Sequence, residues 1–162
     1  FIADMATKDK YDITIMAFNQ YQGYLDTDIQ AKTFEQFADD TDENGEVNVL
    51  INGAQTYSSE GTSSGVTINP QVAQVASTKL FAGMQTFEGF IFLMDGSTYE
   101  SLITDSETGE KADIFLDLSQ YSGQNAAFQG DKLYLKDTQL AKDWGFKEVP
   151  DDLFLCLRDF DK

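Results

Sequence analysis

Extended apolar segments alternate along this chain with segments of helical periodicity, and this alternation constrains the fold more than any other feature. Residues 11–18 form a β-branched, mostly apolar run that is typical of a buried strand. Residues 46–51 and 90–94 are two further runs of this kind, and a stretch with helical spacing separates each run from the next. Strands that alternate with helices pair mostly in parallel and carry the helices on the faces of their sheet.

The two stretches between these strands have recognisable helix signals. One helix is predicted from about Asp26 to Ala38, and a second from Pro70 to about Met84 with Asn69 as its N-cap. Apolar residues of the second helix fall on one face, which we expect to be buried. This predicted stripe consists of Val72, Val75, Ala76, Leu80 and Met84.

The C-terminal part of the chain continues the alternation with shorter elements. A short helix is predicted through Leu102 and Ile103, and a short strand at residues 132–135. A short helix at residues 138–144 and a last strand at residues 153–157 complete the order.

This order of elements predicts an α/β fold of three layers. A mostly parallel or mixed sheet of about four to five strands has helices on both faces, connected by right-handed crossovers. The chain of 162 residues shows no internal repeat and no linker-like composition, which favours a single domain. We expect residues 11–162 to form this domain, preceded by residues 1–10 as an N-terminal arm.

Composition disfavours catalysis. The chain has no histidine, which removes the commonest general base, the Ser-His and Cys-His nucleophile pairs and the usual zinc ligand. Its only cysteine, Cys156, lies in an apolar strand-like run and is expected to be a buried structural thiol. We therefore predict that the protein is not an enzyme and uses no cofactor. Abundant carboxylates leave an acidic hydrolase as an alternative.

Net charge restricts the partners. The chain has 28 acidic and 11 basic residues, for a formal net charge of −17. Nucleic acids and anionic membranes are recognised by Lys and Arg, so neither is an expected partner. A cationic ligand or a metal ion suits this charge, although acidity also serves solubility alone.

Polar residues follow three of the apolar strands. In open α/β sheets, ligands bind beyond the carboxyl ends of the strands. Amide side chains can hydrogen-bond a ligand there, tyrosine rings can stack on it, and a carboxylate can attract a cation or cap the next helix. The predicted ligand-binding residues are Asn19, Gln20, Tyr21, Asn52, Tyr57, Asp95 and Ser97.

An acidic segment after the first predicted helix matches half of an EF-hand calcium loop. Asp40, Asp42 and Asn44 supply oxygens at positions 1, 3 and 5, and Gly45 occupies position 6. Position 12 requires a bidentate glutamate, but Ile51 occupies it, and a strand follows where a helix is needed. We interpret the segment as an acidic turn, with a calcium site at Asp40, Asp42 and Asn44 as the alternative.

Three segments resemble the extracellular solute-binding proteins of bacterial transporters. Residues 12–19 resemble their opening strand, and residues 77–95 resemble the segment in which a helix precedes a strand that ends in Asp. Residues 114–119 (IFLDLS) are similar to the turn that often follows. The resemblance covers about residues 11–120 and implies one lobe of a type 2 periplasmic-binding-like fold.

The resemblance implies a non-catalytic extracytoplasmic domain that binds a small polar or cationic solute. It also implies an extracellular or membrane-anchored location facing outside, with the export signal upstream of residue 1. The alternative is a cell-surface or membrane-anchored interaction module that has kept the fold and lost the ligand pocket. Its partner would be a membrane or cell-surface protein.

Overall fold

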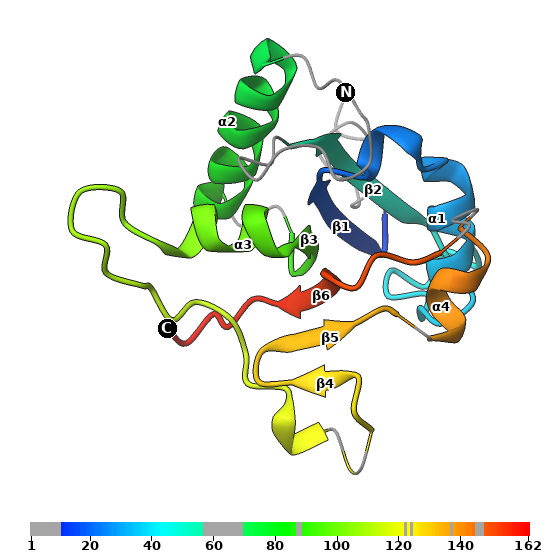
Figure 1. The fold of residues 1–162 in the computed structure, drawn as a ribbon. Helices are drawn as coiled ribbons and strands as arrows, with labels where there is room; N and C mark the ends of the chain where they lie inside the picture. Colours follow the sequence, from blue (N-terminus) through cyan, green and yellow to red (C-terminus); the bar gives the residue numbers. More distant parts are fainter. Residues whose placement is uncertain are drawn as a thin grey trace, which may run out of the picture.

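A six-stranded mixed sheet forms the centre of the computed structural model, in the order β2-β1-β3-β6-β5-β4 (Figure 1). The structure describes residues 11–56, 70–86, 89–121, 123, 125–136, 138–144 and 148–162; the predicted arm, residues 1–10, lies outside them. The strands are β1 (Ile13–Asn19), β2 (Val49–Gln55), β3 (Ile91–Asp95), β4 (Phe128–Gln129), β5 (Lys132–Tyr134) and β6 (Leu153–Leu157). The predicted α/β class is confirmed, with six strands instead of four to five.

The carboxyl ends of four of the six strands lie at the same edge of the sheet. β1 pairs in parallel with both β2 and β3. β6 runs antiparallel to β3 and also to β5, so β5 has the same direction as β1, β2 and β3. We call the edge at which these four strands end the carboxyl edge, and the opposite one the amino edge.

Helices cover both faces of the sheet, as predicted. The helices are α1 (Thr27–Glu35), α2 (Pro70–Thr86), α3 (Gly96–Ile103) and α4 (Gln139–Lys142), with 3-10 turns η1 (Gln22–Tyr24) and η2 (Ser119–Tyr121). Successive strand residues point to opposite faces. Helices α2 and α3 lie on one face of the sheet and α1 and α4 on the other (Figure 1). Phe18, Phe92 and Phe154 pack in the core under α2 and α3, whereas Ile15 and Leu93 pack in the core under α1 and α4. Within the described part of the chain, no helix is both long and apolar enough to span a bilayer.

The buried stripe of α2 differs from the predicted one. Ala76, Leu80 and Met84 are buried as predicted, but Val72 and Val75 are 50% and 58% exposed. Ala73 and Gly83 take their places against the sheet. The helix thus buries Ala73 and Gly83 where two valines were expected, which hydrophobicity alone does not predict.

β2 begins and ends later than predicted because its backbone passes very close to β1. The predicted strand covered residues 46–51, whereas β2 runs from Val49 to Gln55 and includes Asn52 and Gly53. A Cβ at Gly53 would lie 2.2 Å from the carbonyl oxygen of Ala17. Glycine at this position therefore allows close strand pairing, and Asn52-Gly53 is not a turn.

Replacing Gly53 with Ala should destabilise the fold by about 1–3 kcal/mol, because the added methyl group meets rigid backbone. Urea unfolding measures this change. Gly96→Ala is the matched control, since nothing lies within 4 Å of its added Cβ and it starts a helix. Equal stability of the two variants would contradict the close approach of β1 and β2.

Candidate functional site

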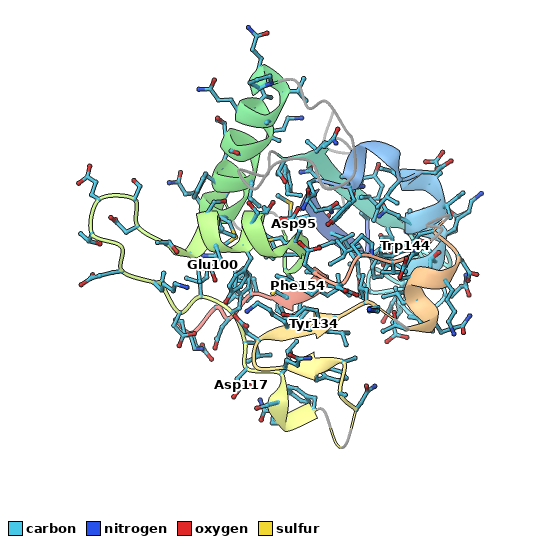
Figure 2. The ribbon with its side chains drawn as sticks, viewed as in Figure 1. Asp95, Glu100, Asp117, Tyr134, Trp144 and Phe154 are labelled. Atoms are coloured by element: carbon cyan, nitrogen blue, oxygen red, sulfur yellow. The ribbon has the colours of Figure 1, made fainter. Side chains whose placement is uncertain are left out.

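The topological switch point of the sheet lies between β1 and β3. The chain moves from β1 to β2 on one side and then returns past β1 to β3 on the other side. At such a point two neighbouring connections leave in opposite directions and create a crevice at the carboxyl edge. Asn19 ends β1 and Asp95 ends β3, where α3 begins (Figure 2).

Asp95 joins the ends of these two strands. Its side chain is fully buried. The backbone N–H of Gln20 donates to Oδ2 at 2.6 Å, and the N–H of Thr98 donates to Oδ1 at 2.7 Å. The carboxylate therefore caps α3 and also fixes the loop after β1. Burial raises the pKa of Asp95 above its usual value, and the two N–H donors partly oppose this shift.

A buried chain of amides stabilises the same loop from beneath. Asn19 accepts a hydrogen bond from the N–H of Tyr21 at 3.0 Å and donates to Gln22 Oε1 at 3.2 Å. Gln22 in turn donates to Gln30 Oε1 of α1 at 2.7 Å. All three amides are almost completely inaccessible. Asn19 is therefore a structural residue of the loop, and a ligand at the edge would meet Gln20 and Tyr21.

Carboxylates gather around the Tyr21 ring. Its hydroxyl donates to Asp152 Oδ1 at 2.8 Å, directly before β6. Burial, this hydrogen bond and the charges of Asp152, Asp95 and Asp151 raise the pKa of Tyr21, so the phenol stays protonated. The Lys136 ammonium pairs with Asp151. Because Lys136 balances only one of these three carboxylates, the carboxyl edge next to Tyr21 keeps a negative potential that attracts cations.

An open groove of about 880 Å³ lies at the same edge, between the end of β5 and the start of α4. Asp151 forms part of its wall, so the groove adjoins the Tyr21–Asp152 pair. Tyr134 also lines it, and its ring meets Phe154 edge-on at 5.3 Å (Figure 2). The other lining residues are Asn125, Ala126, Ala127, Gln129, Lys136, Thr138 and Gln139.

The groove residues were not predicted from sequence. The strand at residues 132–135 was recognised, and Lys136 follows it just as Gln20 follows β1. The same rule of polar residues beyond a strand end could therefore have found Lys136 and Thr138. To apply this rule, one must know that β5 ends at the same edge of the sheet as β1, and only its antiparallel pairing with β6 shows this.

Five of the seven predicted ligand residues lie at the ends of β1 and β3: Asn19, Gln20, Tyr21, Asp95 and Ser97. The predicted position of Asn52 is wrong, because it lies in the middle of β2 opposite Met16. Tyr57 lies outside the described residues.

The predicted calcium residues form an acidic turn. Asp40 accepts the N–H groups of Asn44 and Gly45, and Gly45 has a φ of 90° that favours glycine. The carboxylates of Asp40 and Asp42 also lie near Asp12, with one oxygen of each within 4.8 Å of the others. Ile51 belongs to β2. The turn interpretation accounts for the bonding of these carboxylates, and calcium binding stays a prediction.

No protein-family model, curated protein or solved structure matches this chain. Its function is therefore inferred from the chemistry of the carboxyl edge and from the sequence resemblance.

Asp95→Ala should destabilise the protein by about 2–4 kcal/mol, since it leaves the N–H groups of Gln20 and Thr98 without their acceptor. Chemical denaturation measures the loss. Asp26→Ala removes the cap of α1, which accepts only local N–H groups, and should cost about 1 kcal/mol. Similar losses in the two variants would argue against a role of Asp95 beyond helix capping.

Asp12 should make stability depend on acid pH. The N–H of Asn48 and the N–H and hydroxyl of Thr41 donate to its carboxylate and hold its pKa below 3.8. Its stabilising effect is therefore present above this pH and is lost as pH falls through the lower pKa of the folded state. Asp12→Asn should be less stable than the unmodified chain at about pH 7, and the difference should shrink at about pH 2. Urea unfolding at both pH values measures this, and a difference that is independent of pH would contradict it.

Proposed function

We propose that this chain is a non-catalytic, extracytoplasmic solute-binding domain, and that a small polar cation binds at its carboxyl edge beside Tyr21. The observation that carries the proposal is the contact of Tyr21 with Asp152 at the switch point of the sheet, where Asp95 binds the N–H of the neighbouring Gln20. Ligands of open α/β sheets bind at this position. The resemblance to extracellular solute-binding proteins supports the same function and the exported location.

Each accessible group at the edge has a role in this proposal. Asp152 attracts the cationic group, and the Tyr21 ring provides a face for a cation–π contact. Gln20, next to Tyr21 in the chain, and Ser97, in the first turn of α3, are half-buried and supply hydrogen bonds. The adjoining groove of about 880 Å³ accommodates the rest of the solute, within the usual range of small-molecule sites.

The chemistry of the edge favours binding over turnover. Three of its hydroxyl groups are engaged with neutral or acidic partners: Thr56 with Thr98 at 2.6 Å, and Tyr21 with Asp152. Cys156 is fully buried on a strand, and burial raises the pKa of its thiol, so it stays protonated. A hydrolytic pair of carboxylates would need a raised pKa on an accessible acid, whereas Asp95 is enclosed by its hydrogen bonds.

A second candidate function is protein interaction, either through the outer side of α2 or, on the opposite face of the sheet, near the end of α1. Phe37, directly after α1, is 71% exposed, and Val72, Val75 and Phe81 of α2 are 46–58% exposed. Lys79 is the only charged residue of α2, in a chain with a net charge of −17. Exposed apolar side chains on a helix with a single charged residue favour a protein partner.

Cationic solutes should stabilise the protein against heat. We would record thermal shifts with choline, glycine betaine, arginine, putrescine and spermidine, and with glutamate and citrate as anionic counterparts. A solute at a hundred times its dissociation constant should add about 2.7 kcal/mol to the free energy of unfolding. Shifts from the anions alone, or from none of these solutes, would contradict the proposed cation site.

Asp152→Asn tests the position of the site. It should weaken binding of an active cation at least about tenfold, because the carboxylate closest to the Tyr21 hydroxyl is neutralised. Asp113→Asn removes the same charge from a side chain that is 80% exposed and pairs with Lys162. Equal loss of affinity in both variants would point to the net charge of the protein instead of this site.

A further inference from the structure

We infer that the amino edge of the sheet holds a second binding site, which takes an uncharged, apolar small molecule. The site is a hollow of about 450 Å³ on the face of the sheet that also carries α1 and α4. The groove and the hollow have no lining residue in common, so this site is independent of the proposed cation site.

Three neighbouring strands form the floor of the hollow. Ile91 of β3 pairs with Leu157 of β6, and Leu155 of β6 pairs with Leu133 of β5. These four side chains point to the same face because residues of one strand alternate. Trp144, after α4, packs on the same face of the sheet (Figure 2).

A connecting segment forms one wall. Residues 114–121, here called the strap, cross the amino edge and are fixed there by backbone hydrogen bonds. The N–H of Leu116 donates to the carbonyl of Leu157, and the N–H of Leu118 donates to the carbonyl of Gly130, both at 2.8 Å. Leu116 and Leu118 line the hollow from the strap, and the wall is therefore held by backbone hydrogen bonds.

Aromatic rings surround the opening. Phe90 and Tyr121 are 42% and 62% exposed, whereas Phe34 of α1 is 9% exposed and lies deeper. Phe90 is positioned by stacking on Phe160 at a ring distance of 5.7 Å. An apolar floor with aromatic rings beside it is the usual composition of a small-molecule pocket.

The lining specifies the charge of the ligand. Among the described residues, every lining side chain is apolar except Tyr121, and none is charged, although the whole chain carries −17. A carboxylate or ammonium group in the hollow would lose its water without gaining a partner, which is strongly unfavourable. An uncharged ligand with an apolar body and at most one polar group, placed at the rim beside Tyr121, fits this lining.

The size of the hollow favours a small molecule over a second copy of the chain. Its volume of about 450 Å³ is within the range of ligand pockets. A stable dimer interface needs about 800 Å² on each partner, and two copies of charge −17 repel each other.

A displacement assay tests this site. Nile red, an uncharged fluorescent dye, should bind saturably, and octanol should displace it at a concentration at least about tenfold lower than octanoate does, because only octanoate must bury a charge. Absence of saturable Nile red binding, or equal potency of octanol and octanoate, would overturn the proposal.

Variants assign the binding to the hollow. Leu116→Trp should fill it and reduce Nile red affinity at least about tenfold. Phe90→Ala removes a ring from the rim and should reduce Nile red affinity several-fold. This second variant tests the site even if Leu116→Trp fails to fold. Phe37→Ala, which removes an exposed ring outside the hollow, should leave affinity unchanged.

Two results would reject the site in favour of another occupant or another surface. One is a loss of affinity in Phe37→Ala as large as in Phe90→Ala, which would place the dye on exposed rings in general. The other is a dimer, detected by light scattering after gel filtration, that Leu116→Trp dissociates, which would assign the hollow to a second copy of the chain.

Discussion

The candidate site depends on the two hydrogen bonds that the buried carboxylate of Asp95 accepts. It accepts N–H groups from the loop after β1 and from the first turn of α3, and so joins two neighbouring strand ends at the switch point. Removal of a carboxylate from water is unfavourable, and these donors offset part of that cost. The loop that carries Gln20 and Tyr21 is held in place because the N–H of Gln20 is one of the donors that this buried carboxylate needs.

The two edges of the sheet differ in chemistry because different kinds of segment adjoin the strands at each edge. At the carboxyl edge the chain leaves the strands through polar loops, and Asp151 and Asp152 precede β6 at the same place. At the amino edge the strap crosses the apolar ends of β3 and β6. One sheet can therefore present an acidic surface at its carboxyl edge and an apolar hollow at its amino edge, and the two suit different classes of ligand.

Strands were predicted correctly from sequence where a continuous apolar run is also buried on both faces of the sheet. The strands at residues 90–94 and 153–157 are continuous apolar runs that must be buried, and Asp95 was recognised as a cap or a site residue because it ends one of them. Prediction failed for Val72 and Val75, since α2 meets the sheet through smaller residues. It also failed for Asn52, because the close approach of Gly53 to Ala17 continues β2 through a dipeptide that normally favours a turn.

The sequence by itself determined the α/β class, the absence of histidine chemistry, the acidic charge and the residues at the ends of β1 and β3. Local periodicity and side-chain chemistry carry this information, and neither depends on distant parts of the chain. Only the tertiary structure decided that β6 runs antiparallel between β3 and β5, which brings Asp152 to Tyr21 and Lys136 to Asp151. Pairing between strands so far apart in the chain leaves no local signal, so the acidic edge, the groove and the hollow are products of the fold.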